Sequence, residues 1–177
     1  GRQVDAPVPV ESPVLGGDTV RYFAVPNTDE YFLFENRQAI GSDTAQLNPE
    51  CRSGGRSCAK GPGLLIWHID AGQIALHGFY QDNRVNTGSI HGVALVQADG
   101  LDQLREPGGR NRGDAGDVWP GSAGNTLFGT ETNPASLDNT GATAGFVVDS
   151  IERLTAEGAV RFHLSLTPPG EVLVSLT

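Results

Sequence analysis

Hydrophobic and polar positions alternate with a period of two along several stretches of the chain. In residues 30–37, Phe32 and Phe34 fall on one face of a strand, and Tyr31 and Leu33 fall on the other. Residues 63–70 are apolar for most of their length, which is typical of a central strand covered on both faces. The same reasoning predicts further strands at 19–25, 92–98, 145–151, 159–166 and 171–176.

Long polar or glycine-rich segments separate these strands. Residues 1–18 predict an extended lead-in, and 101–139 predict loops with one short helix at 101–105. With 24 Gly and 11 Pro, the chain has many residues suited to turns. We therefore expect one all-β domain over 1–177, a sandwich or jelly roll with long loops and little helix. Its parts are the lead-in, a core at 19–121, and a loop with terminal strands at 122–177.

The charge balance limits the classes of partner. The chain has 21 acidic and 12 basic residues, which gives a formal net charge of −9. Such a surface repels nucleic acid, and a calcium ion or a basic partner suits it better. No apolar run approaches the roughly 20 residues of a membrane-spanning helix, so no span is predicted. Because the chain opens at Gly1 and has no methionine, we expect it to be cut from a longer precursor.

Two cysteines, Cys51 and Cys58, stand in a polar, glycine-rich stretch. Two thiols this close in a loop predict a local disulfide, and hence a secreted or extracellular location. A zinc site is the weaker interpretation, because a four-ligand site needs a second pair of ligands nearby.

Four aspartates in two short segments are candidate metal ligands. Asp99 and Asp102 follow a predicted strand, and Asp114 and Asp117 lie in a glycine-rich loop. Closely spaced carboxylates on loops are the hard oxygen ligands that calcium prefers, although neither segment matches an EF-hand. The alternative is that these aspartates only cap turns.

Five residues of the predicted strands are assigned structural roles. Glu35 and Arg37 close one strand, and an ion pair of Arg37 with Glu35 or Asp70 is expected. His68 and Asp70 are two apart and share a strand face; we interpret His68 as the end of a buried strand and Asp70 as the start of the next turn. Trp67 is expected to anchor the core or a loop.

No catalytic residue is identified from the sequence. The chain has neither an HExxH nor a G-x-S-x-G motif. A hydrolase that uses His68, Asp70 and His91 remains an alternative, as does an independent module that binds carbohydrate or protein.

Four segments in order resemble secreted bacterial zinc metallopeptidases of the immune inhibitor A family, in the region downstream of their zinc motif. Between residues 29 and 121 these segments are DEYFLFENRQAIGSD, GPGLLIWHID, HGVALVQADG and RGDAGDVWPG. The resemblance is looser over the last 50 or so residues, and the cysteine-bearing insertion at 50–61 departs from the family pattern.

The resemblance implies a non-catalytic β domain of a secreted peptidase that acts on proteins. Its partner would be the upstream catalytic subdomain of the same precursor, which this domain would stabilise or flank. Zinc would be bound only in that upstream part, and calcium is the cofactor expected here.

Overall fold

The fold is all-β with little helix, as the sequence predicts. The computed structural model describes residues 8–10, 21–44, 61–106, 113–154 and 158–167. In these ranges the strands are β1 (Val8–Val10), β2 (Arg21–Ala24), β3 (Glu30–Arg37), β4 (Gly63–Asp70), β5 (Val93–Val96), β6 (Phe146–Leu154) and β7 (Ala159–Leu166). The helical elements described are α1 (Ala71–His77) and the 3-10 turns η2 (Gly41–Thr44) and η3 (Gln103–Arg105).

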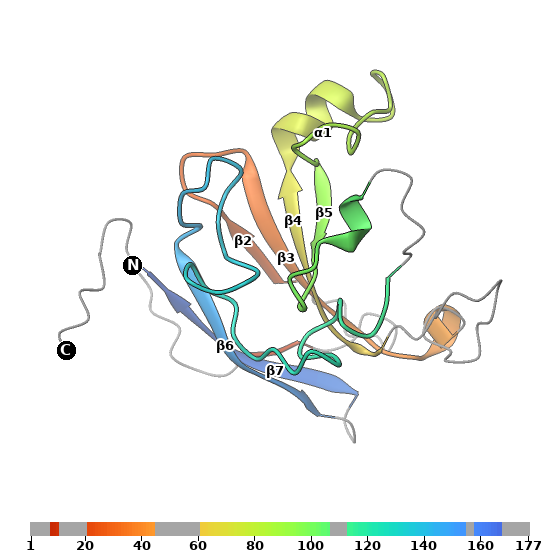
Figure 1. Cartoon of the computed structure of the whole chain (residues 1–177), viewed down its shortest axis with the longest axis vertical. Helices are drawn as coiled ribbons and strands as arrows, with labels where there is room; N and C mark the ends of the chain where they lie inside the picture. The colour runs from red at the N-terminus through yellow and green to blue at the C-terminus, as the bar shows by residue number, and fades with distance from the viewer. Residues whose placement is uncertain (1–7, 11–20, 45–60, 107–112, 155–157, 168–177) are drawn as a thin grey trace.

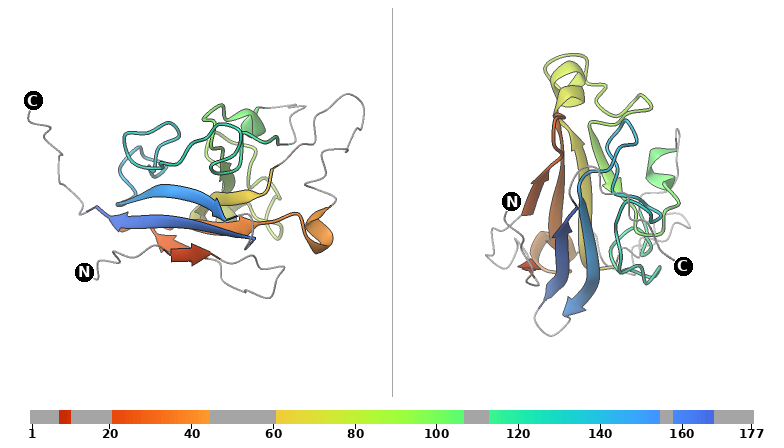
Figure 2. Two further views of the ribbon diagram at one scale, coloured as in Figure 1. Left: turned by 90° about the horizontal axis from the view of Figure 1, so that it is seen from below. Right: turned by 90° about the vertical axis from the view of Figure 1, so that its left-hand side faces the viewer.

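The strands form two antiparallel sheets. One contains three strands in the order β1-β7-β6, and the other contains four in the order β2-β3-β4-β5. In Figure 1 the four-stranded sheet extends upward to α1, and β6 and β7 lie across its lower end. The loop-rich residues 113–145 lie along one face of the strands, as the two views of Figure 2 also show. Two antiparallel sheets are consistent with the predicted sandwich.

The paired strands β3 and β4 position most of the residues discussed below. Every second residue of β3 is buried, as its alternating sequence requires. The pairing places Glu30 opposite Asp70 and Phe32 opposite His68. These four side chains therefore share one face of the sheet, and Trp67 lies on the other face.

Aromatic side chains connect the two sheets. The ring centroids of Phe34 in β3 and Phe162 in β7 are 5.5 Å apart, and those of Phe32 in β3 and Phe146 in β6 are 5.2 Å apart. Trp119, from the loop before β6, is fully buried in the same core. Each side chain of this size contributes about 1.5–3 kcal/mol when fully buried, so this cluster fixes how the sheets pack.

The predicted boundaries hold for the most regular strands. The ranges 30–37, 63–70 and 159–166 match β3, β4 and β7 to the residue. The strand predicted at 92–98 is shorter as β5, and that at 145–151 is longer as β6.

Within the predicted lead-in at 1–18, the described residues form β1, which pairs with β7. Two local predictions need correction. The helix predicted at 101–105 is only the 3-10 turn η3. The helix α1 is missing from the predicted elements; it begins because the Asp70 side chain accepts a hydrogen bond from the N–H of Gln73 (2.9 Å) and so caps its N-terminus.

Some predictions fall on other parts of the chain. Cys51, Cys58 and the strand at 171–176 lie outside the described residues. The disulfide therefore stays a prediction.

Candidate functional site

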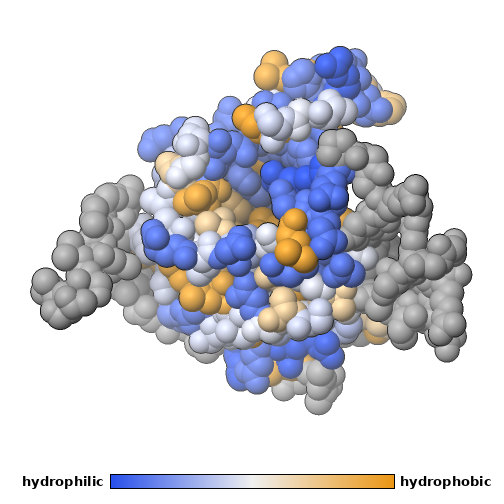
Figure 3. Space-filling view, viewed as in Figure 1, coloured by the Kyte–Doolittle hydropathy of each residue, from blue (hydrophilic) through white to orange (hydrophobic). Residues whose placement is uncertain are grey.

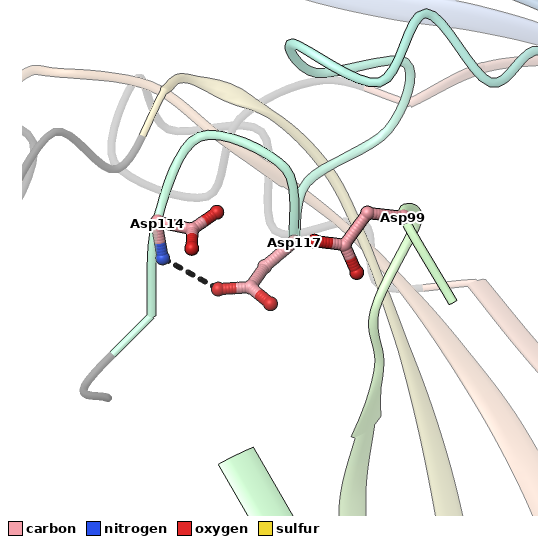
Figure 4. A group of neighbouring side chains, drawn as sticks. All are labelled: Asp99, Asp114 and Asp117. Atoms are coloured by element: carbon pink, nitrogen blue, oxygen red, sulfur yellow. Dashed lines mark hydrogen bonds between the residues drawn. The ribbon is translucent and has the colours of Figure 1, made fainter. Parts of the chain in front are cut away.

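Three of the four candidate calcium ligands lie together. One carboxylate oxygen from each of Asp99, Asp114 and Asp117 can be chosen so that all three lie within 4.8 Å of one another. Figure 4 shows that Asp114 and Asp117 stand on one tight loop and that Asp99 approaches from the segment after β5. Two separate segments of the chain therefore build one acidic cluster.

Hydrogen bonds to the backbone hold these carboxylates in place. The N–H of Asp114 donates to Asp117 Oδ2 (2.5 Å), and the N–H of Gly116 donates to Asp114 Oδ1 (2.7 Å). Asp99 Oδ1 accepts from the N–H of Leu101 (3.0 Å). The cluster is thus ordered by its own loops, as Asx-type turns are.

The close approach of Asp99 depends on a glycine. A Cβ atom placed on Gly116 would lie 2.7 Å from Asp99 Oδ2. That distance is below van der Waals contact, so Gly116 lets the Asp99 carboxylate lie against bare backbone of the loop that carries Asp114 and Asp117.

Asp102 does not join the cluster. It occupies the left-handed region (φ 53°) at the start of η3, and its Oδ1 lies 3.3 Å from both Arg105 Nε and Gln97 Nε2. Its carboxylate is therefore paired with Arg105, and the predicted set of four ligands reduces to Asp99, Asp114 and Asp117.

The donor set fits calcium. All three ligands are carboxylates, and like charges this close repel one another unless a cation neutralises them. Calcium takes about six to eight oxygen ligands, so three aspartates would supply part of the shell and would leave the remainder to water or backbone carbonyls. Zinc sites use imidazole and thiolate, which this cluster lacks.

A second polar group is buried on the core face of β3 and β4. His68 Nε2 lies 2.6 Å from Glu30 Oε2, and both side chains are nearly inaccessible. The N–H of Asn139 also donates to Glu30 Oε2 (2.9 Å), and Asn139 Nδ2 donates to Asp70 Oδ2 (2.8 Å). These contacts attach the loop around Asn139 to the ends of β3 and β4.

The environment of His68 favours its neutral form. Burial lowers the pKa of His68, while the hydrogen bond and charge of Glu30 oppose this and the charge of Arg105 adds to it. The imidazole also stacks on Phe32, with centroids 4.5 Å apart and the planes 7° from parallel. A neutral imidazole that donates Nε2–H to the Glu30 carboxylate satisfies these contacts.

The opposite face of the sheet carries the predicted structural group of Glu35, Arg37 and Trp67. Trp67 Nε1 donates to Glu35 Oε2 (3.0 Å), and Arg37 binds Glu35 Oε1 through Nε (2.9 Å) and Nη2. Arg37 also lies 3.7 Å from Asp43. Of the two partners expected for Arg37, the structure shows Glu35, because Asp70 pairs with Glu30 at the other end of β3 and lies on the other face of the sheet.

Two hollows adjoin these groups. The larger, of about 710 Å³, is lined by Trp67, Arg105, Asp114 and Asp117 among others, and the smaller, of about 300 Å³, is lined by His68 and Arg105 among others. On the face seen in Figure 3, hydrophobic atoms form several small groups that hydrophilic atoms separate.

The residues of the alternative hydrolase do not meet in one place. His68 and Asp70 share a face but are bound to Glu30 and Asn139, whereas His91 lines the larger hollow. Burial, followed by the charge of Arg105, lowers the pKa of His91.

A serine, a histidine and an aspartate also meet between β6 and β7, but not as a catalytic triad. Asp149 Oδ2 (3.1 Å) and Ser165 Oγ (3.4 Å) both approach Nδ1 of His163. A triad needs the acid and the nucleophile on different ring nitrogens.

Sequence reasoning missed Glu30, Asn139 and Arg105. Glu30 and Asn139 are 109 residues apart, so no local spacing indicates their contact. The available signal was a glutamate at a buried position of the alternating strand 30–37, which requires a partner.

None of the helices in the described ranges has the length and apolar character needed to cross a membrane. Comparison of the chain with protein-family models, curated proteins and solved structures finds no match. The resemblance to the immune inhibitor A family therefore stays a prediction.

Proposed function

We propose that this chain is a non-catalytic, calcium-stabilised β domain of a secreted zinc metallopeptidase. It would flank the upstream catalytic subdomain of the same precursor, where zinc is bound, and the whole protein would act on protein substrates. The role of this part of the chain is then mechanical: it presents a rigid sheet whose loops are fixed by calcium.

The observation that carries this proposal is the convergence of Asp99, Asp114 and Asp117. The sequence singled out these residues as calcium ligands from two separate segments, and the fold brings their carboxylates within 4.8 Å. Calcium bound there would tie the end of β5 to the loop that precedes the buried Trp119. Neutralisation of three carboxylates would then favour the folded state.

The arrangement of the family-like segments supports the relation to a peptidase. The four segments contain β3, β4, β5 and the loop of Asp114 and Asp117, and β3, β4 and β5 are neighbours in one sheet. The resemblance therefore covers a continuous structural unit. Such a unit is what a domain shared with a larger protein would retain.

Two measurements test the relation to a peptidase. The coding sequence upstream of Gly1 should contain an HExxH motif, and the encoded protein should cleave casein in a zinc-dependent manner. The catalytic segment expressed without residues 1–177 should lose activity on warming faster than the segment expressed with them.

A precursor without HExxH, or a catalytic segment equally stable without this chain, would contradict the peptidase part of the proposal. Calcium binding is tested separately, so the two parts can fail independently.

A further inference from the structure

The edge strand β5 has one open position for hydrogen bonding. The N–H of Asp70 donates to the carbonyl of Gly92 (2.9 Å). Because the direction of the backbone groups alternates along an antiparallel strand, those of Ala94 and Val96 also point toward β4. Val93 and Leu95 then point theirs outward. Val93 is covered, because the Asn86 side chain accepts from its N–H (3.0 Å) and donates to its carbonyl (2.7 Å).

Leu95 has no comparable cover. Its outward N–H and carbonyl find no hydrogen-bond partner among the described residues. Unpaired backbone groups on a sheet edge are a template for another strand.

The two hollows lie on the two sides of this position. Leu95 lines both of them. The larger is lined by Leu65, Trp67 and Val93, and the smaller by Phe32, His68 and Val96. Trp67 and His68 are neighbours on β4, so their side chains point to opposite faces of the sheet. A strand added beside Leu95 would direct its successive side chains into these two hollows in turn.

Arg105 adds a donor at the same position. Its side chain is about one-third exposed and lines both hollows, and its Nε is buried without a hydrogen-bond acceptor in the described part of the chain. The nearest carboxylate oxygen, Asp102 Oδ1, is 3.3 Å from Nε as an ion pair. Because Nε itself is buried and faces Asp102, a hydrogen bond to a carbonyl of a bound backbone would come from the Nη groups of the guanidinium.

We propose that β5 binds a short extended peptide by strand addition. Leu95 would exchange two backbone hydrogen bonds with the peptide, Arg105 would donate to a neighbouring peptide carbonyl, and apolar side chains would enter the two hollows. A single open ladder position favours a peptide over a second copy of the chain, because a stable dimer buries about 800 Å² per partner. This inference goes beyond the proposed function and does not depend on calcium or on a zinc site.

The test uses the whole chain, labelled with a fluorophore, on an array of overlapping decapeptides from casein. Peptides with alternating apolar residues should be retained, in calcium and in EDTA alike. N-methylation of the backbone of the strongest binder should weaken its affinity by about tenfold, since it removes a backbone donor. Hydrogen exchange at the Leu95 amide should slow when that peptide binds.

Variants locate the site. R105A should weaken binding by roughly five- to tenfold, whereas R84A, which removes a surface arginine, should leave it unchanged. L95P removes the outward N–H without breaking the ladder to β4, so it should also reduce binding while the melting temperature stays close to that of the original chain. If L95P does not fold, exchange at the Leu95 amide still decides the question.

The proposal is overturned if no array peptide binds. It is equally overturned if N-methylation and R105A leave affinity unchanged, or if the Leu95 amide exchanges at the same rate with and without peptide.

Discussion

His68 Nε2 lies 2.6 Å from Glu30 Oε2 on the buried face of β3 and β4. The same carboxylate oxygen accepts the N–H of Asn139, so one acidic side chain connects two strands and a distant loop. Removal of either partner from such a group would leave a buried polar atom without a hydrogen bond, which costs about 1–3 kcal/mol. The His68–Glu30 pair therefore holds β3, β4 and the Asn139 loop together, and it should make the stability of the fold depend on pH.

Stability should fall as the pH drops below about 6.5. The pKa of His68 is lowered in the folded protein, mainly by burial, so protonation favours the unfolded chain. The contribution is fully present above the unfolded pKa of about 6.5 and is lost as the pH falls toward the folded pKa. Asp70 and Arg105 also act on this imidazole, in opposite directions. Urea unfolding at pH 7.5 and pH 5 measures the difference.

Glutamine variants identify the responsible histidine. H68Q should lose part of the pH dependence between pH 7.5 and pH 5, and H77Q, which changes a histidine about 39% exposed, should keep it. An unchanged pH profile for H68Q would show that His68 does not cause the effect.

Replacement of Asn139 should loosen the loop that it anchors. N139A removes the hydrogen bond to Asp70 and should lower the free energy of unfolding by about 1–2 kcal/mol. N139D should cost more at pH 7, because it adds a carboxylate beside Asp70 and Glu30, and the excess should shrink in acid. Equal losses for the two variants at every pH would contradict this account.

The ion pair of Glu35 with Arg37 should contribute more to the free energy of unfolding than an exposed ion pair. E35A removes the acceptor of both Trp67 Nε1 and Arg37, two partly buried donors, and should cost about 1–2 kcal/mol. E152A breaks the exposed pair with Arg161 and should cost about 0–1 kcal/mol. Denaturant unfolding followed by tryptophan fluorescence measures the loss of stability in each variant. Similar losses in E35A and E152A would contradict a stabilising role for the hydrogen bonds of Glu35 to Trp67 and Arg37.

The sequence was most informative where one physical constraint dominates. Alternation in 30–37 and the apolar run in 63–70 predict β3 and β4 because a two-sided sheet dictates both patterns. Of the four aspartates that the sequence grouped as candidate ligands, Asp99, Asp114 and Asp117 lie together in the fold. Asp102 lies apart from them, because a left-handed turn directs it to Arg105 instead.

The rest depends on contacts that no local pattern contains. The bond of Asn139 to Glu30 joins residues 109 positions apart. The helix α1 was missed because Asp70 ends a strand and caps a helix at once, so the boundary has no separate signal.

A substitution at Gly116 tests whether calcium binding needs the close approach of Asp99 to this glycine. G116A would place a methyl group 2.7 Å from Asp99 Oδ2 and should therefore weaken calcium binding measured by titration calorimetry. G88A is the matched control, since the nearest atom to its new methyl group would be 3.8 Å away. Equal calcium affinity in the two variants would show that Asp99 does not need this approach.

The most direct test of the calcium-stabilised domain is thermal unfolding with calcium and with EDTA. Calcium at about 100 times its dissociation constant should stabilise the chain by about 2.7 kcal/mol, or roughly 5–10 °C. D114N and D117N should abolish the shift, and D102N, whose carboxylate lies outside the cluster, should retain it. A melting temperature that does not respond to calcium, or a shift that D114N and D117N leave intact, would contradict the account.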